Sequence, residues 1–202
     1  YLMMLQDLPQ APGVGETVKV SLDGIDKGVD RLKAIVEDML DITRIEGQTL
    51  RVHPEQMLAK ESVLATVRMM ESAARERNLS IQVDAMEGLP PICADAKRLQ
   101  QVFFNLLSNA IKYTPDGGEI KIWAKVTKGI ELKHHGRPTS ETGEFLQIVF
   151  EDIGIGIDPE EHERIFELFY EIRDVSLHST SKTRFMGGGL GLGLAIARGI
   201  VE

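Results

Sequence analysis

Two asparagines and a lysine recur at helical spacing in the stretch NLLSNAIKYTP, residues 105–115. Asn105, Asn109 and Lys112 occupy positions i, i+4 and i+7, so on a helix they share one face. An amide oxygen is a hard, neutral ligand that Mg²⁺ accepts, and a lysine ammonium can reach a phosphate as a point charge. This face therefore suits a divalent cation and a polyphosphate. Taken alone, an ordinary solvated helix face explains the same three residues equally well.

Apolar residues occupy a different face of the same helix, with the spacing of a core-facing stripe. They are Leu99, Val102, Phe103, Leu106 and Ala110. Asp95 stands where an N-cap residue accepts hydrogen bonds from the first free N–H groups of a helix. The sequence therefore predicts a packed helix whose asparagines and lysine lie away from the core.

A second cluster, DIGIGIDPEE, spans residues 152–161 and directly follows a predicted strand. Asp152 ends that strand, and its carboxylate can accept a hydrogen bond from the amino group of adenine. Gly154 and Gly156 allow the backbone to turn tightly and to approach a ring. Pro159 predicts the start of a short helix. An ordinary glycine turn is the alternative interpretation of this cluster.

A third cluster, IFELFYE, carries Phe166 and Phe169 at helical spacing, which predicts that both rings lie in the core. The segment that follows, residues 172–186, is polar, has few apolar anchors and is a candidate mobile lid. Its cationic residues are Arg173, Lys182 and Arg184.

The last cluster, GGGLGLGLAIARGIVE, places a run of glycines ahead of a predicted helix. Glycine-rich backbone at a helix N-terminus suits an anion, because free N–H groups and the helix dipole point at the charge. The run is not a Walker A loop, since no Gly-Lys-Ser/Thr follows it, and no preceding strand supports a dinucleotide fingerprint. By itself it is weak evidence for an anion site.

The composition is that of a soluble globular chain whose 202 residues form one ordinary domain with room for a small second element. The formal net charge of −8 argues against nucleic-acid binding and against anionic membranes, since both need excess Lys and Arg. The single cysteine, Cys93, excludes an internal disulfide, and no apolar run approaches the length of a membrane span. Because Tyr1 is not a start methionine, we expect the chain to be part of a longer protein.

A heptad seam of apolar residues runs from Val18 to Met39 and predicts a long helix that ends near Gly47. With the apolar segment 1–5, this helix predicts a hairpin that dimerises into a four-helix bundle, or alternatively a helix packed on its own domain. Strands are predicted at 50–53, 79–84, 119–126 and 145–152, and a further helix at 58–77. The order predicts an α+β fold with one mixed sheet and helices on one face.

The order of the four clusters carries a resemblance to a known family. NLLSNAIKYTP, DIGIGI, IFELFYE and GGGLGLGLAI resemble the N, G1, F and G2 boxes of sensor histidine kinases, and MLDITRIEG resembles the end of their second dimerisation helix. The resemblance implies a Bergerat ATP-binding fold, a two-layer α+β sandwich, in residues 49–202. It implies part of a dimerisation hairpin in residues 1–48.

The resemblance also implies that the chain binds ATP and Mg²⁺. Asn109 would bind Mg²⁺ with Asn105 beside it, Lys112 would contact phosphate, and Tyr113 would line the nucleotide. Asp152 would bind the adenine amino group. The other residues at matching positions would shape the nucleotide site, namely Gly154, Gly156, Ile157, Gly189, Gly191, Leu192 and Gly193.

Four features depart from the family pattern. The phosphoacceptor histidine box is absent, so we expect that this chain does not phosphorylate itself. Glu171 stands where many relatives have an arginine, so a contact to the γ-phosphate would come from one of the three lid cations. Leu190 replaces a small hydroxyl residue, and the chain stops at Glu202, before the strands that normally finish the sheet.

Asn105 distinguishes a kinase from an ATPase. Related ATPases carry a glutamate at this position that activates water as a general base, and an amide cannot take that proton. The resemblance therefore implies a protein-histidine kinase that transfers the γ-phosphoryl group to a histidine upstream of this chain. A Bergerat-fold ATPase and a degenerate dimerising module that binds no nucleotide are the alternatives.

The partners implied by the resemblance are a second copy of the chain, through the helical hairpin, and the receiver domain of a response regulator. A cytoplasmic location is implied for this chain, without membrane contact of its own. The longer protein can be anchored in a membrane upstream.

Overall fold

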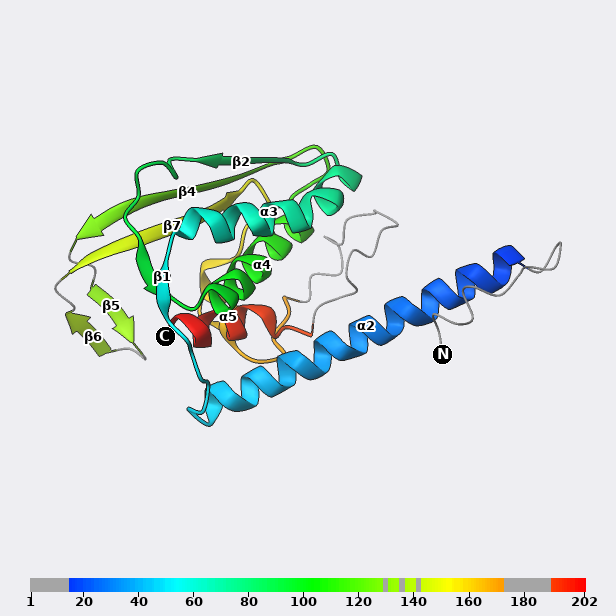
Figure 1. The fold of residues 1–202 in the computed structure, drawn as a ribbon, viewed down its shortest axis with the longest axis horizontal. Coiled ribbons are helices and arrows are strands. Elements are labelled where there is room, and N and C mark those ends of the chain that lie inside the picture. The colour runs from blue at the N-terminus through cyan, green and yellow to red at the C-terminus, as the bar shows by residue number, and fades with distance from the viewer. Residues whose placement is uncertain (1–14, 129–130, 135–136, 141–142, 173–189) are drawn as a thin grey trace.

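The computed structural model describes residues 15–128, 131–134, 137–140, 143–172 and 190–202. One long helix precedes an α+β domain, as Figure 1 shows. The elements are, in chain order, α2 (Gly15–Glu46), β1 (Glu55–Met57), α3 (Ala59–Glu76), β2 (Ser80–Asp84), β3 (Ile92–Ala94), α4 (Ala96–Tyr113), β4 (Glu119–Lys128), β5 (Glu131–His134), β6 (Arg137–Ser140), β7 (Glu144–Asp152), the short 3₁₀ helices η1 (Pro159–Glu161) and η2 (Arg164–Phe166), and α5 (Gly193–Val201).

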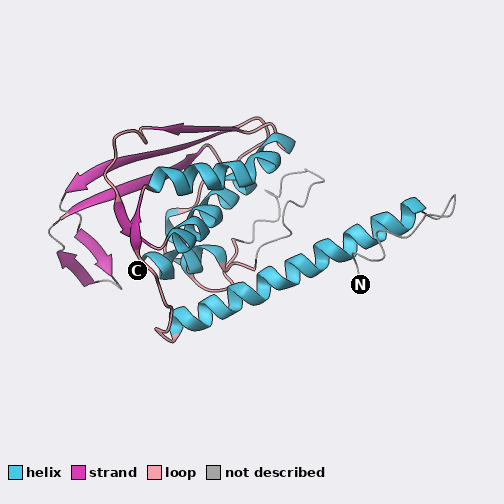
Figure 2. Ribbon diagram, in the orientation of Figure 1, coloured by secondary structure: helices cyan, strands magenta, loops and turns pink. Residues whose placement is uncertain are grey.

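The central sheet is mixed and has the strand order β2-β4-β7. β2 runs parallel to β4, with Ile81 opposite Ile120, and β7 runs antiparallel to β4, with Phe150 opposite Ile122. The helices α3 and α4 lie on one face of this sheet (Figures 1 and 2). The predicted α+β class is confirmed. The expectation of one sheet is wrong, because β1 pairs with β3 and β5 with β6 in separate two-stranded ladders.

The core lies between the sheet and the helices α3 and α4. Leu107 and Ile111 of α4 and Ile120 and Ile122 of β4 are completely buried, and the ring of Phe103 packs against that of Phe150 at 5.5 Å. The predicted core residues of α4 lie in this cluster or pack against it, and the sequence interpretation missed Leu107 and Ile111. This apolar contact sets the rotation of α4 about its axis, which decides where its polar face points.

Among the described residues, the long helix α2 meets the domain only through its C-terminal part, and its N-terminal half projects beyond the other described elements (Figure 1). Most of the predicted heptad residues are exposed on it, namely Val18, Ile25, Val29, Leu32, Val36 and Met39. The predicted end near Gly47 is confirmed, while the apolar segment 1–5 lies outside the described residues. No described helix is long and apolar enough to cross a membrane.

The strand predicted at 50–53 is wrong, and the strand in this part of the chain is β1, at Glu55–Met57. The backbone N–H of His53 donates to the carboxylate of Asp95 at 2.9 Å, and Pro54 has no N–H to give to a ladder. Pairing with β3 therefore begins only after Pro54, where Glu55 lies opposite Ala94.

Candidate functional site

The polar face of α4 carries the first candidate residues. Asn105, Asn109 and Lys112 all lie within this helix and are partly buried. As predicted, Asp95 is its N-cap, and its side chain accepts hydrogen bonds from the backbone N–H groups of Lys97 and Arg98 at 3.0 and 3.1 Å. The apolar stripe and the cap together fix the orientation of this polar face relative to the rest of the domain.

The glycine run meets the amide face at the start of α5. The side-chain Nδ2 of Asn105 donates a hydrogen bond of 2.9 Å to the carbonyl oxygen of Gly193, the first residue of α5. Leu192 is almost completely buried, so its side chain supports this contact from inside and only its backbone can face a ligand. The structure thus brings together two clusters separated by 88 positions in the sequence.

The glycine loop after β7 docks on the C-terminal end of α4. Asp152 Oδ1 accepts a hydrogen bond of 2.8 Å from the backbone N–H of Gly154. A β-carbon on Gly154 would lie 2.9 Å from the carbonyl oxygen of Tyr113, and the N–H of Ile155 donates to that same oxygen at 3.4 Å. Only glycine fits this close approach. Asp152 and the Lys112–Tyr113 end of α4 consequently lie at one edge of the domain.

This edge combines charge with exposed apolar surface. The Lys112 ammonium lies 4.8 Å from the centre of the Tyr113 ring, and 42% of Tyr113 is exposed. Ile153, Ile155 and Ile157 of the glycine loop are all exposed as well. Exposed apolar side chains next to a carboxylate and an ammonium suit a ligand that has both a flat ring and anionic groups. A cavity of about 500 Å³ lies elsewhere, at the N-terminal end of α4, and holds none of the candidate residues.

The third cluster is not the helix that its spacing predicted. η2 ends at Phe166, and Phe169 has a left-handed backbone, with φ 61°, that leaves 59% of the residue exposed. The prediction of a buried Phe169 is therefore wrong, because this turn breaks the helical spacing. Phe166 is partly buried, and the Arg198 guanidinium of α5 lies 5.4 Å from its ring.

Gly191 packs directly against this turn. Its φ is +68°, and an added β-carbon would lie 2.6 Å from the carbonyl oxygen of Tyr170 and 2.9 Å from the carbonyl carbon of Phe169. Tyr170 is itself held by Glu161, which accepts its hydroxyl hydrogen bond, and by Arg164, whose guanidinium lies 4.4 Å from its ring. Gly191 is therefore needed for the contact between the third cluster and the glycine run.

Replacing this glycine tests the contact. We expect Gly191→Ala to destabilise the chain by at least about 1–2 kcal/mol, since a left-handed alanine alone costs that much. For a chain of this length the melting temperature falls by about 2–4 °C per kcal/mol. Thermal unfolding measures the change, and Gly28→Ala in α2, where an added β-carbon meets nothing within 4 Å, is the control. Equal melting temperatures for the Gly191 and Gly28 variants would contradict this role.

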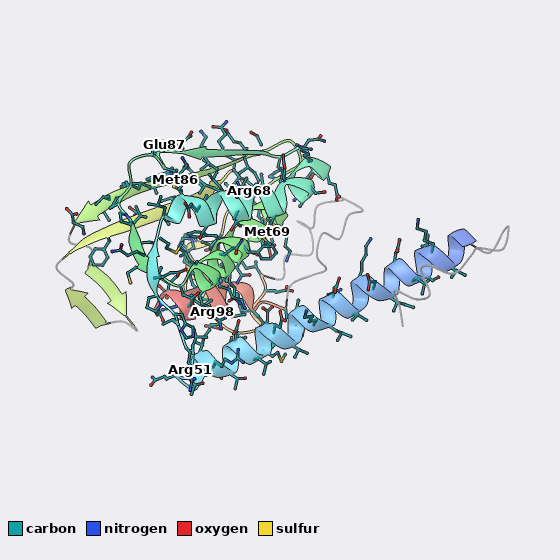
Figure 3. All side chains as sticks on the ribbon, in the orientation of Figure 1. Arg51, Arg68, Met69, Met86, Glu87 and Arg98 are labelled. Carbon is teal, nitrogen blue, oxygen red and sulfur yellow. The ribbon has the colours of Figure 1, made fainter. Side chains whose placement is uncertain are left out.

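An ion pair joins α2 to the start of α4. Asp41 is 7% exposed, and its Oδ2 accepts hydrogen bonds from Arg98 Nη1 at 2.7 Å and from Gln101 Nε2 at 2.9 Å. Figure 3 shows Arg98 on the side of α4 that faces α2. Nearby, Ile45 of α2 lies against Gly199 of α5 so closely that a side chain on Gly199 would clash. The sequence interpretation missed this junction, because nothing in the spacing of these residues links segments 57 positions apart.

The charges of the junction shift the pKa values of its carboxyl groups. Burial raises the pKa of Asp41, but the hydrogen bonds from Arg98 and Gln101 and the charges of Arg98 and Arg44 outweigh it and leave the pKa below 3.8. Burial, followed by the charges of Asp41 and Glu37, raises the pKa of Asp38. Asp41 therefore remains charged at neutral pH, as its ion pair requires.

Removing the Asp41 charge should loosen the junction. We expect Asp41→Asn to lower the free energy of unfolding by about 1–3 kcal/mol at pH 7, because Arg98 loses its carboxylate partner. A carboxyl group whose pKa is lowered by folding stabilises the fold above its unfolded pKa. That contribution is lost as the pH falls through the folded value.

The difference between wild type and Asp41→Asn should therefore shrink below about pH 4. Thermal unfolding of both proteins between about pH 7 and pH 3 measures it. Asp38→Asn is a control. Because folding raises the pKa of Asp38, its charged form opposes folding, so this substitution should raise the stability at pH 7. A difference in stability that stays constant over this range would rule out the ion pair as its source.

The remaining candidates cannot be placed. Gly189 and the lid cations Arg173, Lys182 and Arg184 lie outside the described residues. Among the described residues, no group of three His, Cys, Asp or Glu side chains could hold a metal ion. The metal candidates predicted from the sequence are the amides of Asn105 and Asn109, and both lie on α4. Their neutral oxygens fit Mg²⁺, which keeps several waters and phosphate oxygens among its ligands.

Comparison with known proteins agrees with this arrangement. The family model described as "Histidine kinase-, DNA gyrase B-, and HSP90-like ATPase" matches residues 94–202. The adaptive-response sensory kinase SasA of Prochlorococcus marinus (strain MIT 9303) is 29% identical over 180 residues, which are 89% of this chain. The chain spans 42% of the length of that relative.

Two solved structures share the fold. Full-length ShkA in complex with AMPPNP is similar with a TM-score of 0.70 at 21% identity, over 98% of this chain and 36% of ShkA. Histidine kinase ThkA in complex with the response regulator TrrA is similar with a TM-score of 0.55 at 22% identity, over 84% of this chain and 44% of that one.

The matched region begins at Ala94, directly before α4, and it includes the amide face, the glycine loop after β7 and α5. The resemblance inferred from the four clusters is thus confirmed, and the domain is homologous to the catalytic domain of sensor histidine kinases. The chain belongs to the family of histidine kinase-, DNA gyrase B- and HSP90-like ATPases.

Proposed function

We propose that this chain is the ATP-binding part of a sensor histidine kinase and that it transfers the γ-phosphoryl group of ATP to a histidine. The observation that carries the proposal is the hydrogen bond from Asn105 to Gly193, which joins the amide face of α4 to the glycine run. Around it lie residues that would contact the base and the phosphates of a nucleotide. The match to histidine kinases over most of the chain supports the same conclusion.

In this proposal the adenine ring lies against the glycine loop after β7. Asp152 already accepts from Gly154 N–H through Oδ1, and its second oxygen accepts from the adenine amino group. Tyr113, Ile157 and the backbone of Gly154 and Gly156 line the ring. Lys112 would contact a phosphate, and the backbone of Gly191, Leu192 and Gly193 would lie beside the phosphates. The same role is proposed for Gly189, which is outside the described residues. ShkA was solved with AMPPNP, an ATP analogue, which supports a nucleotide at this fold.

Asn109 and Asn105 would hold Mg²⁺ through their amide oxygens. Bound Mg²⁺ neutralises charge on the phosphate oxygens during transfer. Because Asn105 donates its amide hydrogen to Gly193, its oxygen stays turned away from that bond and remains available as an acceptor. Arg173, Lys182 or Arg184 would supply a further cation to the transferred group.

The chemical step is an in-line displacement at the γ-phosphorus. A neutral imidazole nitrogen of the acceptor histidine attacks, the bond from the γ-phosphorus to the bridging oxygen breaks, and ADP leaves with that electron pair. The other ring nitrogen then gives its proton to water, which leaves a neutral ring bearing the phosphoryl group. The role of this chain is to position the nucleotide and to stabilise its charge.

Asn105 also argues against hydrolysis. A water nucleophile needs a general base, and the amide of Asn105 cannot take a proton. An ATPase of the same family is the second candidate function, since the matching family model includes DNA gyrase B- and HSP90-like ATPases. The two functions differ in where the phosphate goes.

The partners follow from the same proposal. Residues 1–48 would belong to a dimerisation hairpin and residues 49–202 to the catalytic domain. The exposed heptad residues of α2 would pack against a second copy of the chain. The aspartate of a response-regulator receiver domain would then accept the phosphoryl group, as suggested by the complex of ThkA with TrrA.

The proposal is tested with γ-labelled ATP and Mg²⁺. The full-length protein and this 202-residue chain are incubated in parallel, and acid-labile protein phosphate and free phosphate are followed in the same samples. We expect label on the full-length protein, little free phosphate, and no label on this chain alone. Asn109→Ala in the full-length protein is the control and should remove the label.

The opposite results are equally informative. Rapid release of free phosphate without labelled protein would establish the ATPase. Absence of both products, together with failure to bind ATP, would favour a module that acts through dimer contacts only.

A further inference from the structure

Arg77 is a buried arginine just after the end of α3, and no candidate cluster contains it. Only 5% of the residue is exposed, although its sequence context, ARERN, is that of a solvated helix end. Its guanidinium contacts the last turn of α4. Nη1 donates to the carbonyl oxygens of Ile111 and Lys112, the latter at 3.1 Å, and Nη2 donates to that of Thr114 at 2.9 Å.

The carbonyl between these acceptors belongs to the proposed nucleotide site. Tyr113 O accepts the N–H of Ile155 in the glycine loop at 3.4 Å. Ala110 O accepts both the N–H of Thr114 at 3.0 Å and its hydroxyl at 2.6 Å. The last carbonyls of a helix have no partner within the helix. Here every carbonyl from Ala110 to Thr114 has one, and Arg77 supplies three of them.

Arg77 also changes the electrostatics of this helix end. The C-terminus of a helix carries roughly −0.5 of an elementary charge, which repels an anion. Asp116, whose carboxylate accepts from Arg77 Nε at 2.8 Å, adds a full negative charge there. The proposed phosphate contact, Lys112, lies in this same turn. A buried guanidinium that contacts both the carbonyls and the carboxylate offsets this negative charge.

We propose that Arg77 is a positioning residue of the nucleotide site. By binding the last turn of α4, it orients Lys112 and Tyr113 and, through Tyr113, the loop that carries Asp152. The inference rests on the proposed function, since it assigns to Arg77 a part in nucleotide binding. A flat guanidinium with several donors can contact three carbonyls and a carboxylate at once, and a lysine ammonium cannot.

The test compares nucleotide affinity with stability in this chain. The dissociation constant of a fluorescent ATP analogue in the presence of Mg²⁺ and the melting temperature are measured for wild type, Arg77→Met and Arg77→Lys. We expect Arg77→Met to weaken binding about tenfold or more, because displacement of Lys112 and Tyr113 would weaken charged contacts to the nucleotide, and one such contact is worth about a factor of ten in affinity. Arg77→Lys should bind the analogue more tightly than Arg77→Met but less tightly than wild type, since it restores the positive charge without the planar set of N–H donors.

Val63→Ala is the matched control. Val63 is completely buried near the start of α3, far along the helix from Arg77, and its truncation lowers stability through a cavity. We expect it to lower the melting temperature while leaving affinity within about twofold of wild type. Equal loss of affinity in Val63→Ala and Arg77→Met at similar melting temperatures would overturn the proposal and leave Arg77 a structural residue.

Further outcomes separate the two proposals. Wild-type affinity in Arg77→Met, with weakened binding in Asn109→Ala, would refute only the role of Arg77. Failure of the wild-type chain to bind the analogue would refute the proposed function and, with it, this inference. If Arg77→Met does not fold, Arg77→Lys decides: unchanged affinity in that variant would also overturn the role.

Discussion

Asp152→Asn is expected to move the preference of the site from ATP towards GTP. Asp152 offers only acceptors, which match the amino group on C6 of adenine, whereas guanine has a carbonyl oxygen at that position. The asparagine oxygen can keep the hydrogen bond from Gly154 N–H, so its NH₂ group takes the place of the second carboxylate oxygen. A donor would then face the adenine amino group, leaving both without a partner.

The expected loss of affinity for ATP follows from the free-energy cost of leaving two hydrogen-bond donors without an acceptor. A loss of about 1–3 kcal/mol corresponds to about a 5- to 150-fold weaker affinity for ATP. GTP should bind the variant at least as well as it binds wild type. Competition of each nucleotide against a fluorescent ATP analogue measures both affinities.

Asp158→Asn is the matched control for this prediction. Asp158 lies in the same loop, where its Oδ1 accepts from the N–H of Glu160 at 3.1 Å, and no role in nucleotide binding is proposed for it. The control should leave the ratio of ATP to GTP affinity unchanged. If Asp152→Asn binds ATP as wild type does, Asp152 does not belong to the site.

Asn109→Ala is expected to abolish the Mg²⁺-dependent part of ATP binding while the fold stays intact. Alanine is a better helix former than asparagine, and the asparagine is only partly buried on α4, so the helix should persist. The variant loses the amide oxygen proposed as a metal ligand. We expect affinity for Mg²⁺-ATP to fall about tenfold or more, whereas affinity in EDTA should change little.

Calorimetric titration of ATP with Mg²⁺ and with EDTA gives the two affinities. Ser108→Ala, the neighbouring residue on α4, is the control and should respond to Mg²⁺ as wild type does. Circular dichroism and the melting temperature report whether the fold is retained. An equal response to Mg²⁺ in wild type and Asn109→Ala would refute the metal role of this residue.

The local part of the fold could be predicted from the sequence. Helix α4 has an apolar stripe of period 3.6 and an acidic N-cap, and both signals act within a few residues, so its position and polar face were predicted correctly. The same holds for β2 and β7, which lie within one residue of their predicted bounds. The family assignment also rests on short local motifs.

The contacts between distant segments could not be predicted in this way. Arg77 and Asp41 each bind residues that lie at least 34 positions away, and in the sequence both resemble ordinary charged residues of a solvated helix. Phe169 has the spacing of a core residue, but its backbone is left-handed and lies close to Gly191, which is 22 positions away in the sequence. The roles of the individual nucleotide-binding residues remain predictions.

The first turn of α4 is attached to α2 and to the connection that follows α2. Arg98 binds Asp41 of α2, and Asp95 binds the backbone of His53 in the connection after α2. Asn109 lies 11 residues beyond Arg98, which is about 16 Å along the helix at a rise of about 1.5 Å per residue. A tilt of α4 by only about 4° about its first turn would therefore displace Asn109 by about 1 Å. A shift of this size can change the rate of a reaction that depends on positioning about a hundredfold.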